Sequence, residues 1–110
     1  MIVGIGAEYE GRKVENVFRL TLVTGFIDTH MHIESSLVMP FEFDRCVMPL
    51  DVITTICDPH KTANMIGPEG IRYFQEASQY TLIDIRIQLS SCVPTTDMET
   101  AGAWTDTGDL

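Results

Sequence analysis

The chain has 110 residues and 45% of them are hydrophobic, so it is long enough to form one small domain around an apolar core. Its 16 acidic residues outnumber its 7 basic residues, and the net charge of -9 argues against nucleic acid and anionic membranes as partners. The chain has no apolar run near the roughly 20 residues that span a bilayer, and no basic segment followed by an apolar one at its start. We therefore expect a soluble, cytoplasmic protein.

The cysteine pattern indicates a reducing environment. Three cysteines, Cys46, Cys57 and Cys92, are an odd number and form no Cys-x-x-Cys pair. This pattern fits neither a disulfide framework nor a zinc ribbon. We interpret the three thiols as reduced and structural.

The first part of the chain predicts two short strands. Residues 1–8 are apolar and broken by glycines, residues 9–13 are typical of a turn, and residues 14–23 alternate weakly between apolar and polar side chains. Within this chain, each strand has only the other as an obvious partner.

A histidine pair ends the next predicted strand, from about Leu22 to His32. Side chains alternate along a strand, so His30 and His32 are predicted to project from one face, and Asp28 shares their parity. Neutral imidazole is the commonest metal ligand in proteins, and two imidazoles supply half of a four-coordinate shell. The alternative is a strand end with two solvated histidines.

The rest of the chain alternates between helices and strands. A short helix is predicted over 40–48, a β-branched strand over 52–57, a helix from 67 to about 79 and an alternating strand over 82–89. This order is typical of an α/β fold with parallel βαβ units.

Polar residues follow each of the predicted strands. Ligands of such folds gather at the carboxyl ends of the strands. We therefore expect a site there. The sequence has no glycine-rich phosphate-binding loop, which argues against a nucleotide as the ligand. The candidate site residues, apart from the two histidines, are Asp28, Glu34, Asp58, His60, Ser91 and Cys92.

These motifs carry a resemblance to a known family. Residues 25–32, Gly-Phe-Ile-Asp-Thr-His-Met-His, resemble the first-strand signature of the amidohydrolase superfamily. Together with the blocks at 30–36, 56–60 and 90–94, they resemble the adenine deaminases of that superfamily in order and spacing. The resemblance implies a (β/α)8 barrel, of which residues 25–110 would form the first βαβαβ units. Residues 1–24 would be strands of a small flanking β domain.

The same resemblance implies a reaction and a cofactor. The reaction is hydrolytic deamination of adenine to hypoxanthine and ammonia, on a small-molecule purine base. His30 and His32 would bind a divalent metal, Mn or Fe with Zn as a further option, in a centre that is binuclear in full-length members. Asp28 would support the strand end or the histidines. The other candidates would contact substrate or support the ligands, and the general acid or base has no assignment in this chain.

Length sets a limit on these expectations. A barrel of this class needs about 250 residues, so we expect a truncated frame, a gene fragment or an excised segment with little deaminase activity of its own. Uncovered strand edges also predict self-association, as a homo-oligomer or an aggregate. Two positions depart from the family pattern, because Thr24 replaces a proline and Lys61 replaces a glutamate.

Three alternatives stay open at this point. One is another cyclic amidohydrolase of the dihydroorotase or imidazolonepropionase type, which shares the first-strand motif. Another is a non-catalytic α/β module that binds a structural metal or none. The third is a zinc cytidine deaminase, since His32-Ile33-Glu34 matches half of that signature, although the required Pro-Cys-x-x-Cys is missing.

Overall fold

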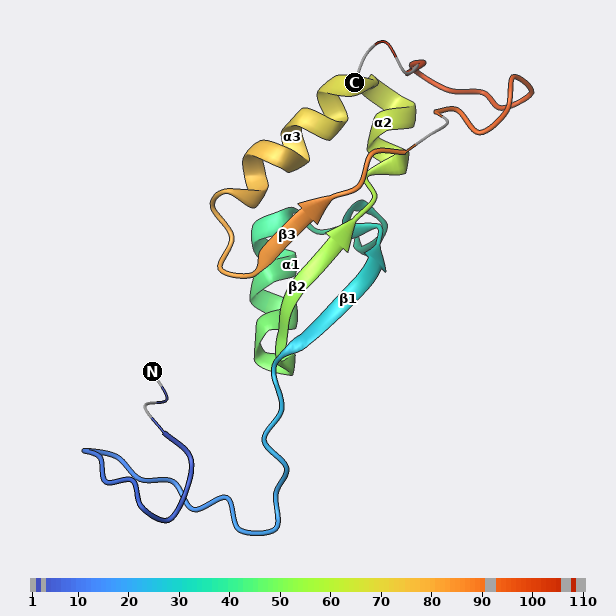
Figure 1. The fold of residues 1–110 in the computed structure, drawn as a ribbon. Helices are drawn as coiled ribbons and strands as arrows, with labels where there is room; N and C mark the ends of the chain where they lie inside the picture. Colours follow the sequence, from blue (N-terminus) through green and yellow to red (C-terminus); the bar gives the residue numbers. More distant parts are fainter. Residues whose placement is uncertain (1, 3, 91–92, 106–107, 109–110) are drawn as a thin grey trace.

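The fold is built on a three-stranded parallel sheet (Figure 1). The computed structural model describes residues 2, 4–90, 93–105 and 108. The strands are β1 (Phe26–Met31), β2 (Val52–Cys57) and β3 (Asp84–Ile87), in the order β1-β2-β3. Both pairs are parallel, as the alternating pattern predicts, so the carboxyl ends of all three strands lie at the same edge.

The connections between the strands are helical. The α-helices are α1 (Pro40–Val47), α2 (His60–Ile66) and α3 (Pro68–Ser78), and the 3-10 helices are η1 (Ile33–Ser36) and η2 (Met48–Leu50). Proline is the first residue of α1 and α3, where its missing N–H costs no intrahelical hydrogen bond. Helices α1 and α3 confirm the helices predicted over 40–48 and 67–79.

One helix was not predicted from the sequence. Helix α2 begins at His60, immediately after Pro59, and its few apolar residues give no helical period. Only Gly67, with a φ of 66°, separates it from α3. A positive φ of this kind lets one helix end and the next begin in a new direction, and glycine adopts it without steric cost.

The two strands predicted over 1–8 and 14–23 are wrong for the structure as described. Residues 2 and 4–25 contain no strand; they lead away from the sheet and include several turns and bends (Figure 1). The radius of gyration is 19.2 Å, whereas a compact chain of this length has about 13 Å. A strand is stable only when another strand pairs with its backbone, and the described segment has no such partner. The assignment of residues 1–24 to a small β domain stays a prediction.

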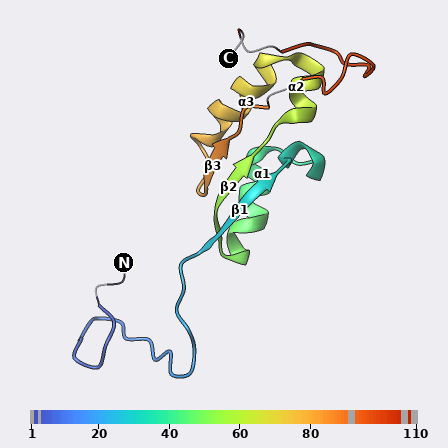
Figure 2. The same cartoon turned by 45° about the vertical axis from the view of Figure 1, so that its right-hand side comes forward.

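The core lies on one face of the sheet. Helices α1 and α3 lie against this face (Figure 2). Their Phe43 and Phe74 belong to the same buried cluster as Cys57 and Ile85 of the sheet. The other face is open, and Ile53 of β2 is 48% exposed. A β-branched run with few charges, such as residues 52–57, predicts a strand covered on both faces. This prediction is wrong for the described chain, because helices pack against one side only. Among the described residues, no helix has the length and apolarity that crossing a bilayer requires.

A buried carboxylate joins α1 to the start of β3. Asp44 Oδ2 accepts the Leu82 N–H at 2.8 Å, and Asp44 Oδ1 accepts the Ile83 N–H at 3.1 Å. Both Asp44 and Ile83 are buried. A carboxylate that accepts two backbone N–H groups satisfies donors which burial would otherwise leave unpaired.

We predict that Asp44→Ala lowers the free energy of unfolding by about 2 kcal/mol, because two backbone donors lose their acceptor. Urea denaturation of the 110-residue chain measures this change. The control is Glu42→Ala, which removes only an exposed ion pair with Arg45 on the same helix and should shift stability by less than about 0.5 kcal/mol. Equal stability of the two variants would contradict the role of Asp44.

Candidate metal centre

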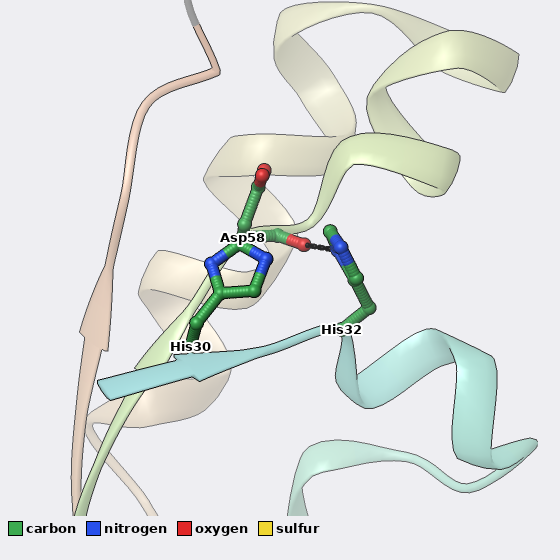
Figure 3. A group of neighbouring side chains, drawn as sticks. All are labelled: His30, His32 and Asp58. Carbon is green, nitrogen blue, oxygen red and sulfur yellow. Dashed lines mark hydrogen bonds between the residues drawn. The ribbon is translucent and has the colours of Figure 1, made fainter. Parts of the chain in front are cut away.

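The parallel pairing of β1 and β2 brings three possible metal ligands together. Met31 pairs with Cys57, so the residues that follow the two strands are neighbours. His30 lies in β1, His32 follows it directly, and Asp58 follows β2 (Figure 3). One ligand atom from each of the three side chains lies within 4.8 Å of the others. The sequence predicts two imidazoles on one face of a strand that ends at His32. In the structure β1 ends one residue earlier, at Met31, and the two rings are neighbours.

A hydrogen bond fixes the orientation of His32. Its Nδ1 lies 2.6 Å from the backbone carbonyl oxygen of Asp58 (Figure 3). A carbonyl oxygen can only accept, so Nδ1 carries the proton and donates it. The neutral ring then has its free lone pair on Nε2, which is the arrangement that metal-bound histidines usually have. The His30 ring is edge-on to the His32 ring, with the centroids 4.8 Å apart.

Asp58 is buried and is held by the ends of the other two strands. Its N–H donates to the Met31 carbonyl at 2.8 Å, and its Oδ1 accepts a short hydrogen bond from the Ser90 hydroxyl. Ser90 is also buried and lies just beyond β3. The predicted residues Ser91 and Cys92 lie outside the described residues, so the serine that contacts the site in the described chain is their neighbour.

The remaining candidates bind backbone or lie to one side. Asp28 Oδ1 accepts the His30 N–H at 3.1 Å, which supports the strand end. Glu34 Oε1 accepts the Lys61 N–H at 3.0 Å, and the Lys61 side chain is exposed. His60 Nε2 lies 3.4 Å from Thr95 Oγ1 and is not one of the clustered ligands.

The clustered donors fit a divalent metal ion. Two imidazole nitrogens and one carboxylate oxygen are the ligands that zinc, iron and manganese take in proteins. Separations within 4.8 Å are close enough for small side-chain rotations to place all three atoms around one ion. The sequence alone had assigned only the two histidines as ligands. Asp58 joins them because its own strand end lies beside theirs.

Comparison with known proteins identifies the family. The model of the amidohydrolase family matches residues 21–107, which is most of the chain and includes all three clustered residues. The chain belongs to the amidohydrolase family. A divalent metal site is expected of this family, and the His-His-Asp cluster is a suitable place for it.

Relatives of this amidohydrolase chain are adenine deaminases. It is 60% identical to the adenine deaminase of Cereibacter sphaeroides (strain ATCC 17025 / ATH 2.4.3), over 99% of this chain and 19% of that protein. It is 60% identical to the adenine deaminase of Sinorhizobium fredii, over 93% of this chain and 18% of that protein. It is 57% identical to adenine deaminase 1 of Rhizobium meliloti, over 99% of this chain and 19% of that protein. The chain thus spans about a fifth of the length of these relatives.

A buried thiol lies beneath the site. Cys57, the last residue of β2, is fully buried in the core. Burial raises its pKa to about 12, well above the ordinary value of a thiol. A backbone hydrogen bond from Ile33 opposes the shift, and the charges of Glu34 and Asp58 add to it. The thiol is therefore neutral at physiological pH and serves as a small apolar side chain.

We predict that an alkylating reagent at about pH 8 modifies Cys46, which is exposed, and spares Cys57 in the folded chain, because the thiolate is the reactive form. Mass spectrometry of the resulting peptides measures the two rates. Denaturant should make the rates equal. Equal rates in the folded chain would contradict the burial.

The same thiol predicts how stability depends on pH. The unfolded chain releases this proton near pH 8.5, whereas the folded chain keeps it until about pH 12. Its contribution to the free energy of unfolding is therefore complete below pH 8.5 and is lost as the pH rises above that value. Cys57→Ser should flatten this alkaline fall in urea titrations.

Proposed function

We propose that this chain takes part in the metal-dependent hydrolytic deamination of adenine to hypoxanthine and ammonia. The observation that carries the proposal is the meeting of His30, His32 and Asp58 at one sheet edge, in a chain up to 60% identical to proteins named adenine deaminase. Those names favour adenine over the substrates of other cyclic amidohydrolases. In this proposal residues 25–110 form the first part of a (β/α)8 barrel, which the parallel order β1-β2-β3 supports.

Each clustered residue has a role in the proposed reaction. His30 and His32 would hold a divalent ion, for which Mn or Fe is proposed ahead of Zn. When bound, such an ion lowers the pKa of a water molecule and supplies hydroxide near neutral pH. The ring of His32 would bind through Nε2, since its Nδ1 proton is held by the Asp58 carbonyl. Asp58 Oδ1 accepts the hydrogen bond from Ser90. We therefore propose that the other carboxylate oxygen, Oδ2, binds the ion or accepts a proton during the reaction.

Exposure differs across the proposed site. His30 is exposed, His32 is half-buried and Asp58 is buried. An ion and a small flat base would therefore approach from the side of His30. Asp58, at the inner side, is held by the Ser90 hydroxyl, which donates to its carboxylate, and by its own backbone N–H, which donates to the Met31 carbonyl. Both bonds keep the residue in place before any ligand binds.

We predict that the 110-residue chain binds Co²⁺, used as a spectroscopic probe, and that His30→Ala and His32→Ala each weaken binding by at least about 100-fold. Loss of a ligand should cost more than the 10–100-fold that supporting residues cost. Titration of the visible absorption band measures the affinity. His60→Ala is the matched control, since His60 lies outside the cluster, and it should bind Co²⁺ as the parent chain does. An equal loss in all three variants would contradict the assignment.

A chimera tests the reaction itself. We predict that Cereibacter sphaeroides adenine deaminase, with its matching 109 residues replaced by this chain, releases ammonia from adenine in the presence of Mn²⁺. His30→Ala in the chimera should lower kcat by at least about 10²-fold, because removal of a ligand removes the activated water.

The control variant for the chimera is Glu42→Ala, which lies on the exposed side of α1 and should retain activity. The 110-residue chain assayed alone should show no turnover. A folded, metal-loaded chimera that leaves adenine unchanged would overturn the proposed function.

A further inference from the structure

The chain segments that follow β1 and β2 stay joined after the strands end. Three hydrogen bonds connect residues 31–34 with residues 58–61. The Asp58 N–H donates to the Met31 carbonyl at 2.8 Å, and His32 Nδ1 donates to the Asp58 carbonyl at 2.6 Å. The third is the bond from the Lys61 N–H to Glu34 Oε1 at 3.0 Å. Two of the three use side chains, so His32 and Glu34 continue the parallel ladder where backbone pairing stops.

The position of Glu34 is strongly constrained. The preceding residue, Ile33, is fully buried in the core cluster, which fixes the backbone of η1. The Lys61 N–H belongs to the first turn of α2, where helical N–H groups have no acceptor within the helix. Glu34 Oε1 supplies that acceptor from another segment.

The second carboxylate oxygen of Glu34 needs a reason for its position. Oε2 is buried and has no hydrogen-bond partner in the part of the chain that the structure describes. An unpaired buried oxygen costs free energy, so the carboxylate would turn outward if nothing held it. The bond from Lys61 is the described contact that holds it inward.

We infer that Glu34 is a positioning residue, which holds residues 58–61 against η1. The Asp58 carbonyl then stays within reach of His32 and keeps the ring proton on Nδ1. This tautomer leaves Nε2 free to bind a metal ion. The two side-chain bonds close a ring through Ile33 on one side and Pro59 and His60 on the other. Loss of the outer bond would let the inner one lengthen. This inference rests on the metal site of the proposed function.

Direct contact of Glu34 with a substrate is a weaker interpretation. Oε1 is already occupied by a backbone N–H, and Oε2 is buried. The partner is the backbone of Lys61, so the side chain at position 61 is not part of the connection. Lys61→Ala therefore serves as a matched control that keeps the N–H donor.

The first experiment needs no metal. Long-range ¹H–¹⁵N NMR spectra, recorded at about pH 8, show which ring nitrogen of a neutral histidine carries the proton. We expect His32 to carry its proton on Nδ1 in the parent chain, in Lys61→Ala and in Glu34→Gln, whose amide oxygen still accepts the Lys61 N–H. In Glu34→Ala the ring should shift to a mixture of tautomers. Hydrogen exchange at the Lys61 amide should accelerate at least about tenfold in the same variant.

The second experiment measures affinity for Co²⁺ alone. Glu34→Ala should weaken binding about 10-fold, the size expected for residues that orient a ligand, while Glu34→Gln stays within about threefold of the parent chain. Asp44→Asn is the structural control, since it weakens a contact elsewhere in the core and should leave Co²⁺ affinity and the His32 tautomer unchanged. If Glu34→Ala does not fold, Glu34→Asp replaces it, because its shorter carboxylate cannot reach Lys61.

The outcomes separate this inference from the proposed function. Retention of the Nδ1 tautomer in Glu34→Ala, with fast exchange at Lys61, would overturn the inference whatever the metal does. Slow exchange at Lys61 in Glu34→Ala would also overturn it, since the bond would then not depend on Glu34. Failure of the parent chain to bind Co²⁺, with the tautomer shift observed, would contradict the metal site of the proposed function and leave the positioning role of Glu34 standing.

Discussion

The hydrogen bond from His32 Nδ1 to the Asp58 carbonyl is the contact on which the site depends. It joins residues 26 positions apart, and it exists because β1 and β2 pair in parallel with Met31 opposite Cys57. It selects one tautomer of a neutral ring and so directs a lone pair away from the backbone. The clustering of His30, His32 and Asp58 follows from the same register.

Carboxylates hold this structure together by binding backbone rather than basic side chains. Asp28 accepts an N–H in its own strand, Asp44 accepts two from the start of β3, and Glu34 accepts one from α2. The ion pairs that the structure describes are instead on exposed side chains, where they contribute little to stability. Part of the acidic surplus of the chain therefore has a structural use, at the points where one element meets the next.

Burial is distributed unevenly around the sheet. Helices α1 and α3 cover one face, while Phe26 and Ile27 of the edge strand β1 are 61% and 60% exposed. The site lies at the carboxyl edge, between the covered face and the open one. Asp58 and Ser90 are buried there and bond to each other, which offsets the cost of placing a carboxylate beside a core. His30 is exposed. The site therefore combines a buried, hydrogen-bonded carboxylate, Asp58, with a solvent-accessible imidazole, His30.

The sequence by itself determined the elements whose signals are local. The β-branched run at 52–57 predicted β2, and proline at 40 and 68 marked the starts of α1 and α3. It also placed two histidines at the end of one strand. Helix α2 was missed because Asp58-Pro59 is typical of a turn, and the strands predicted before residue 25 have no partner in the described chain. Only the tertiary structure decided that Asp58 joins the histidines and that Ser90 and Glu34 hold the strand ends. Such contacts depend on the register between strands, whereas periodicity along a sequence records only which face of its own element a side chain occupies.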